Sequence, residues 1–160
     1  MAPPPRRKKL SKEAEYVETF ILPYMYRKPS HTTEVHWIHA FRKSGTYPEP
    51  TDGSGKWLVF VSKDRIDDLW GLVRQATEDG QLGASAKVST VKPNPNASNP
   101  DKGVICVYTY DWRDRQDVER VRAELRALGV TWKIPYKADE ETFAGKYQVR
   151  GDRRISKYYE

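Results

Sequence analysis

The feature that most constrains the fold is a run of hydrophobic, β-branched and aromatic residues at positions 103–110. No other segment of the chain is as hydrophobic, and residues of these types favour buried strands. We therefore predict a central β-strand here. A second strand-like run at residues 85–90 precedes it, and a loop rich in proline and asparagine joins the two. The rest of the chain is interpreted around this pair of predicted strands.

Lys87 is the sharpest functional clue in the first of these two runs. A strand alternates its side chains between two faces, so one face carries Ser85, Lys87 and Ser89 and the other Ala86, Val88 and Thr90. A lysine among small residues in the middle of a short strand is unusual, because burying an ammonium group is costly. We hypothesise that Lys87 lines a cavity, where it meets an anion or acts as a base.

Length and composition indicate one soluble domain. The chain has 160 residues, of which 38% are hydrophobic and 12% aromatic, and that aromatic content argues against wholesale disorder. The apolar run at residues 20–22 is too short for a signal peptide or membrane helix, so no membrane partner is expected. The only cysteine, Cys106, lies within the predicted central strand and excludes an intrachain disulfide, which favours a cytoplasmic location.

The net charge of +6 is concentrated at the two ends of the chain. Residues 1–12 are rich in proline, arginine and lysine and predict a disordered arm, either a solubilising tail or a grip for nucleic acid. Residues 13–160 form the predicted domain. Near the C-terminus, cations alternate with aromatic residues, as on phosphate-binding surfaces, although a half-packed terminus has the same composition. A nucleic acid or another polyanion is therefore a permitted partner.

Periodic patterns supply the remaining elements. Further strands are predicted at 35–41, 56–61 and 130–137, with a short helix after Ser11. One main helix follows Asp64, a predicted N-cap with Asp67 three residues on, and carries the apolar stripe Ile66, Leu69, Trp70, Val73. Asp114 and Asp117 lead the second, whose apolar stripe is Val118, Val121, Leu125, Leu128. The charges Glu119, Arg120, Arg122, Glu124 and Arg126 predict the solvated face of the second.

The order of these elements predicts the fold class. Pairs of strands that follow each other without a helix between them favour a sheet that is mostly antiparallel or mixed, with both main helices on one face. We therefore predict a single α+β domain. The three histidines, His31, His36 and His39, do not indicate a metal site, because on a strand the last two would point to opposite faces. No metal and no cofactor are expected.

Four blocks of sequence carry a resemblance to a known family. They are Gly55-Lys56-Trp57-Leu58, the segment 82–90, the segment 105–111 and Tyr136-Lys137-Ala138-Asp139. With these blocks in order, roughly residues 34–160 resemble the Bles-type family, named after a basophilic-leukaemia-expressed protein. The resemblance implies the curved-sheet fold of the translation initiation factor 4E cap-binding proteins. Cap binding is not implied, because that activity needs two tryptophans around a charged base and an acidic residue, and no such set is found here.

The chain is also similar, more faintly, to the bacterial phosphothreonine lyases. This similarity implies that Lys87 is the base, Tyr108 the strand tyrosine and Lys56 a phosphate contact, while Leu58 stands where those enzymes have an acid histidine. Arg150, Arg153 and Arg154 would grip the phosphate. A lysine base is chemically sensible, since burial and neighbouring cations depress its pKa. His36 or His39 could replace the missing acid in space.

Three functional hypotheses follow. The first is a binding module for a phosphopeptide, nucleotide or RNA. The second is a lyase that eliminates phosphate, and the third is a non-catalytic scaffold in which Lys87 is structural or exposed. The candidate catalytic residues are Lys87 and Tyr108, and the candidate ligand-binding residues are Lys56, Lys137, Arg150, Arg153 and Arg154. A concave pocket around Lys87 would favour the first two hypotheses, and a solvent-facing Lys87 the third.

Overall fold

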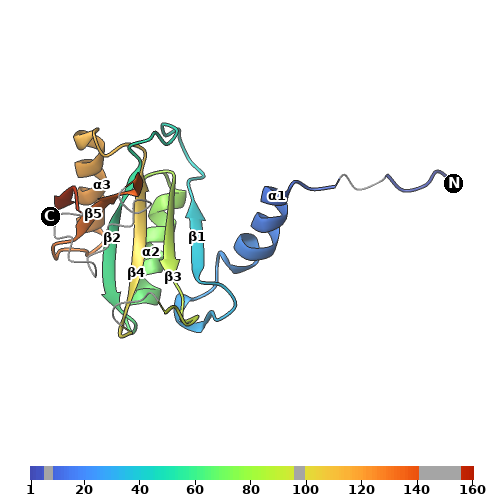
Figure 1. The fold of residues 1–160 in the computed structure, drawn as a ribbon, viewed down its shortest axis with the longest axis horizontal. Helices are drawn as coiled ribbons and strands as arrows, with labels where there is room; N and C mark the ends of the chain where they lie inside the picture. Colours follow the sequence, from blue (N-terminus) through green and yellow to red (C-terminus); the bar gives the residue numbers. More distant parts are fainter. Residues whose placement is uncertain (6–8, 96–99, 141–155) are drawn as a thin grey trace.

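Six strands form one antiparallel sheet in the computed structural model, which describes residues 1–5, 9–95, 100–140 and 156–160 (Figure 1). The strands are β1 (Trp37–Phe41), β2 (Gly55–Ser62), β3 (Ser85–Ser89), β4 (Lys102–Thr109), β5 (Pro135–Ala138) and β6 (Tyr158–Tyr159). They lie in the order β1-β3-β4-β2-β5-β6. The predicted central strand is β4, which pairs with β3 on one side and β2 on the other. Among the described residues every strand pair is antiparallel, so the sheet is not mixed.

Both main helices pack on the same face of the curved sheet. They are α2 (Ile66–Glu78) and α3 (Arg115–Ala127), and their apolar stripes join the hydrophobic core. The predicted α+β architecture, with two main helices on one face, is therefore confirmed. The predicted short helix is α1 (Lys12–Tyr16), which continues as a π turn and a 3-10 turn to Tyr24 and lies to the side of β1 (Figure 1).

Burial alternates along the strands and distinguishes the two sheet faces. In β2, Trp57, Val59 and Val61 are buried beneath the helices, and the residues between them point to the opposite side. Burying a large apolar side chain contributes about 1.5–3 kcal/mol, so the face beneath the helices accounts for most of the hydrophobic stabilisation. We call the other side the helix-free face. It is the face that carries Lys87.

The N-caps of the two main helices differ. The second helix, α3, is capped by Asp114, whose side chain accepts a hydrogen bond from the Asp117 backbone N–H at 3.1 Å. The predicted cap Asp64 is wrong, because Arg65 occupies the cap position of α2 and makes no side-chain bond there. The carboxylate of Asp67 accepts hydrogen bonds from the backbone and hydroxyl of Ser30, at the far end of a loop. A tertiary contact has therefore replaced the local capping pattern.

The strand predicted at residues 130–137 is shorter than the pattern suggested. It begins only at Pro135. Before it, the carbonyls of Val130 and Trp132 accept hydrogen bonds from the guanidinium of Arg122. Because these carbonyls accept from a side chain, they are not available for the backbone hydrogen bonds that would join this segment to a neighbouring strand.

Candidate functional site

The strand register arranges the helix-free face in three rows that cross the sheet. The first row contains Trp37, Ser89, Val104 and Phe60; the middle row His39, Lys87, Cys106 and Leu58; and the third Phe41, Ser85, Tyr108, Lys56 and Lys137. Neighbours within a row are about 4.8 Å apart, and successive rows are about 7 Å apart. All four of the lysines and tyrosines predicted from sequence thus lie on two adjacent rows: Lys87 in the middle row, and Tyr108, Lys56 and Lys137 in the third.

Lys87 occupies the centre of the middle row. Its Cα pairs with His39 on one side and with Cys106 on the other, and its ammonium lies 3.9 Å from the centroid of the Trp37 ring. The side chain is partly buried, and burial lowers the pKa of Lys87 below its ordinary value; Lys56 lowers it further, while Cys106 and the charge of Asp139 act in the opposite direction. Within the described residues no hydrogen bond or ion pair reaches this ammonium. An anion would therefore find an unpaired, partly desolvated donor.

The groups beside Lys87 bring no negative charge. Burial raises the pKa of the Cys106 thiol to about 11, so it is protonated at neutral pH. Burial also raises the pKa of Tyr108, whose phenol therefore remains a hydrogen-bond donor. Neither group can neutralise Lys87, and the phenol of Tyr108, one row away, adds a neutral donor on the same face.

Lys56 and Lys137 are more engaged than Lys87. The ammonium of Lys56 lies 2.7 Å from Asp139 Oδ1 and 5.7 Å from the centre of the Tyr108 ring. Asp139 also accepts a hydrogen bond from the Ser54 hydroxyl at 2.9 Å. Lys137 lies directly opposite Lys56 across the β2–β5 pair and is only 7% exposed. Of the three predicted lysines, Lys87 is the one whose charge is left for a ligand.

The remaining predicted site residues, Arg150, Arg153 and Arg154, lie outside the described residues. Among the strand residues that the structure describes on the helix-free face, none is an arginine. The described part of the chain also contains no group of three or more His, Cys, Asp or Glu side chains that could hold a metal ion. In the same part of the chain, no helix has the length and apolar character needed to cross a bilayer.

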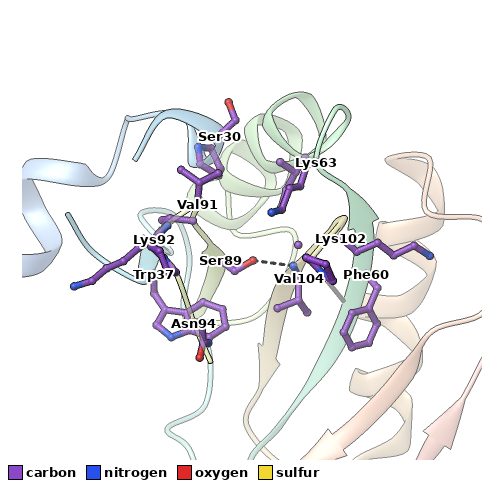
Figure 2. Close-up of a pocket in the computed structure, with 16 residues that line it drawn as sticks. Ser30, Trp37, Phe60, Lys63, Ser89, Val91, Lys92, Asn94, Lys102 and Val104 are labelled. Atoms are coloured by element: carbon purple, nitrogen blue, oxygen red, sulfur yellow. Dashed lines mark hydrogen bonds between the residues drawn. The ribbon is translucent and has the colours of Figure 1, made fainter. Parts of the chain in front are cut away.

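A cavity of about 750 Å³ opens beside the first row (Figure 2). Trp37, Phe60 and Val104 line it together with three lysines, Lys63, Lys92 and Lys102, and its described lining contains no carboxylate. Figure 2 shows the ammonium of Lys63 directed towards the floor, whereas Lys92 and Lys102 point outward. The floor itself is closed, because Ser89 Oγ accepts a hydrogen bond from the Val104 N–H at 2.9 Å. Volumes of this order are typical of small-ligand sites.

The sequence patterns do not predict this cavity. In β1 and β2, buried core residues alternate with exposed or half-buried ones, and Trp37 and Phe60 are among the latter. This alternation indicates that both side chains face away from the helices. Their common row with Ser89 and Val104 depends on the strand register, which alternation alone does not specify. Lys63 follows the end of β2, and Lys102 begins β4. The two strand ends are brought together only by the pairing of β2 with β4.

A second, smaller hollow of about 210 Å³ lies at the opposite end of the face. Tyr108 and Asp139 line it together with Tyr47 and Tyr110. Tyr47 and Tyr110 donate their hydroxyl protons to Asp117 and Asp114, respectively. Its acidic surroundings make it the less suitable of the two hollows for an anion.

The pKa of His39 provides a test of the arrangement around Lys87. Burial lowers the pKa of His39 below its ordinary value of 6.5, and the charge of Lys87 lowers it further. We expect Lys87→Met to raise the His39 pKa, because the substitution removes the repulsion between two cations. An NMR titration of the imidazole protons measures this change. Lys133→Met, at an exposed position, should leave the His39 pKa as it is, and an unchanged value in Lys87→Met would contradict the observed pairing.

Comparison with known proteins identifies one family. The family model described as basophilic leukemia-expressed protein Bles03 matches residues 52–143, which is more than half of the chain. The match includes β2 to β5 and both main helices, and with them Lys56, Lys87 and Tyr108.

Solved structures similar to this chain include three initiation-factor complexes. Schistosome eIF4E with m7GpppA and 4E-BP is 17% identical, with 68% of this chain and 59% of that chain covered and a TM-score of 0.49. C. elegans eIF4E-3 with the 4E-binding protein Mextli and a cap analog is 20% identical, with 57% and 54% covered and a TM-score of 0.46. Ascaris suum eIF4E-3 with m2,2,7G cap is 20% identical, with 54% and 51% covered and a TM-score of 0.41. The chain thus spans between half and three fifths of the length of these proteins.

Proposed function

The chain belongs to the basophilic leukemia-expressed protein Bles03 family, and from this premise we propose that it is a binding module for a phosphorylated or otherwise anionic ligand. The ligand lies on the helix-free face of the sheet, where Lys87 is its principal contact. The observation that carries this proposal is the partly buried ammonium of Lys87, which has no hydrogen-bonding or ionic partner among the described residues. A partly buried charge without a partner lowers the stability of the fold, and an anionic ligand that pairs with it removes that cost.

The surrounding rows support the same ligand class. Tyr108 lies two residues from Cys106 along β4, which makes it a diagonal neighbour of Lys87 at about 7–8 Å between Cα atoms. The Lys87 ammonium lies over Trp37 in the first row, so a phosphate there accepts from the ammonium, and Tyr108 adds a neutral donor further along the same face. Charge-assisted bonds of this kind are about twice as strong as neutral ones. Lys56 and Lys137 add positive potential from the third row, and the predicted contacts Arg150, Arg153 and Arg154 belong to this proposal as well.

Thermal unfolding of wild type, Lys87→Met and Lys133→Met tests the proposal. The ligands are a phosphothreonine peptide, a mononucleotide, inorganic phosphate and a short RNA. A ligand at 100 times its dissociation constant adds about 2.7 kcal/mol of stability, which raises the melting temperature by about 5–10 °C for a chain of this size. We expect this increase in wild type and in Lys133→Met, and its loss in Lys87→Met. Equal stabilisation of all three proteins would contradict a role for Lys87. If no ligand stabilises any of them, the scaffold hypothesis takes its place.

A second candidate function is elimination of phosphate from a phosphothreonine. One observation favours it: His39 faces Lys87 directly across the β1–β3 pair, on the side opposite Leu58. In this reaction the neutral Lys87 amine takes the α-proton, the electron pair of the broken C–H bond forms the Cα–Cβ double bond, and phosphate leaves with a proton from His39, whose lowered pKa makes that proton available mainly below neutral pH. Mass spectrometry of a phosphothreonine peptide after incubation would detect the unsaturated product. A peptide that binds and is recovered unchanged leaves only the binding function.

A further inference from the structure

Two aromatic side chains occupy the ends of the first row. Trp37 is partly buried, and Phe60 is 44% exposed at a point of β2 that pairs with β4 but lies beyond the pairing with β5. Between them lie Ser89 and Val104, which form the cavity floor (Figure 2). An exposed phenylalanine on the helix-free face adds nothing to the core beneath the helices. It does present a flat apolar surface to whatever enters the cavity.

The spacing of the two rings determines what they can hold. Trp37 and Phe60 are separated by three strand spacings of about 4.8 Å, or about 14 Å between their Cα atoms. A single flat ring held between two others would need them much closer, since stacked rings have centroids only about 4.5–7 Å apart. The spacing therefore suits two separate rings of one extended ligand. The ammonium of Lys87 already covers one face of Trp37, which leaves the other face for a ligand ring.

The charges around the cavity specify the rest of the ligand. Lys63, Lys92 and Lys102 line it without any carboxylate in its described lining. The ammonium of Lys63 points to the floor between the two rings, and no hydrogen bond or ion pair occupies it within the described residues (Figure 2). The ligand is therefore negatively charged between its aromatic rings.

We infer that this cavity binds a short segment of single-stranded nucleic acid, with one base stacked on Trp37, another against Phe60 and the intervening phosphates facing Lys63. The inference rests on the proposed function and names its ligand class. Sheet surfaces that bind single strands commonly stack two or three bases on aromatic side chains. On the floor, the Val104 N–H is taken up by Ser89 Oγ, and other uncharged polar groups of the lining, such as Ser30, lie at its rim and not between the two rings (Figure 2). Recognition is therefore by stacking and charge, with little sequence preference.

Other polyanions would use only part of this surface. An acidic peptide would meet the lysines but leave the aromatic pair unused. A duplex would present its phosphates while its bases remained stacked in the helix. Single-stranded RNA and single-stranded DNA share the chemistry required, and a comparison of the two measures any contribution of the 2′-hydroxyl.

Fluorescence anisotropy of the full chain with a labelled six-nucleotide RNA tests the aromatic pair. We expect Trp37→Ala and Phe60→Ala each to weaken binding at least about 10-fold, as for other stacking aromatics. Phe41→Ala is the matched control, because Phe41 lies on the same strand and face as Trp37, is 38% exposed and does not line the cavity. It should bind as wild type. Duplex RNA and an oligoglutamate of equal charge should bind at least about 10-fold more weakly than the single strand.

The salt dependence tests the lysines. Each phosphate contact to a single strand contributes about −0.7 to the slope of log affinity against log salt concentration. We expect Lys63→Met to reduce the magnitude of that slope by about 0.7, and Lys133→Met to leave it unchanged. Circular dichroism confirms that each variant is folded, and Phe60 and Lys63 are exposed enough for their substitution to be tolerated.

The inference is wrong if folded Trp37→Ala and Phe60→Ala both bind the single strand as wild type does, because the affinity then comes from elsewhere, such as the basic residues 1–12. It is also wrong if duplex RNA or oligoglutamate binds as tightly. Either result leaves the proposed function intact when a phosphothreonine peptide still stabilises wild type and not Lys87→Met. Failure of every ligand in both experiments overturns the two together.

Discussion

Arg122→Met is expected to lower the free energy of unfolding by about 3–5 kcal/mol, one of the largest effects of any single substitution in this protein. The Arg122 side chain is fully buried. Its guanidinium donates hydrogen bonds to the backbone carbonyls of Val130 at 2.9 Å, Trp132 at 2.8 Å and Glu160 at 3.0 Å. Methionine matches much of the volume but donates nothing, so the carbonyls of Val130 and Trp132 lose these bonds, while the Glu160 oxygen keeps only the one from the Ile134 N–H at 2.7 Å. Each lost bond to a charged donor costs about 1.5–3 kcal/mol, offset in part because the buried charge also disappears.

Urea unfolding followed by tryptophan fluorescence measures this effect. Arg126→Met, one turn further along α3 at an exposed position, is the matched control and should change stability by less than about 0.5 kcal/mol. Arg122→Lys keeps the charge but can reach fewer of the three carbonyls, so it should fall between the two. A loss below about 1 kcal/mol in Arg122→Met would show that these carbonyls find other partners.

Arg122 also marks a limit of sequence reasoning. The helix pattern placed it on the solvated face of α3 with the other charges, and this prediction is wrong. Its position next to Val121 puts it at the border of the apolar stripe. Whether such a border residue is solvated depends on what packs over it, and here that is the chain from Val130 to Trp132 together with Glu160. These contacts join parts of the chain that no local pattern connects.

Local patterns were sufficient where short-range interactions decide the structure. The alternation at residues 85–90 and the apolar run at 103–110 correctly predicted β3 and β4. Asp64 is not the cap of α2, because the helix begins one residue later and the Asp64 carboxylate is hydrogen-bonded to Ser62, while Asp67 is held by Ser30. The fold class could therefore be predicted from the sequence, while the individual helix ends that depend on tertiary contacts could not.

The candidate site was predictable only in part, for a related reason. Alternation placed Lys87 on the face opposite the core residues of its own strand. Its neighbours His39, Trp37 and Cys106 come from two other strands, and their positions depend on the register of each strand pair. A shift of one residue would turn each of them to the opposite face. The single lysine was therefore visible in the sequence, but the surface around it was not.

Gly83→Ala is expected to destabilise the protein by about 3 kcal/mol or more and to weaken ligand binding by displacing β3 from β4. A methyl group at Gly83 would lie 1.9 Å from the backbone oxygen of Tyr108 and 3.1 Å from its carbonyl carbon. Both atoms belong to the backbone of an interior strand, so a rotamer change cannot relieve the clash. Overpacking of this kind costs about 1–3 kcal/mol when side chains can yield, and more when backbone must move.

Gly71→Ala is the matched control, and it is expected to raise the stability that Gly83→Ala lowers. Gly71 lies in the middle of α2 with open space around it, so alanine should stabilise the helix by about 1 kcal/mol. Thermal and urea unfolding of both variants provide the comparison. The contact at Gly83 lies at the start of β3, next to the pairing that sets Lys87 opposite Cys106. A Gly83→Ala protein as stable as wild type would therefore mean that β3 and β4 do not approach each other as described, and the rows of the helix-free face would have to be reassigned.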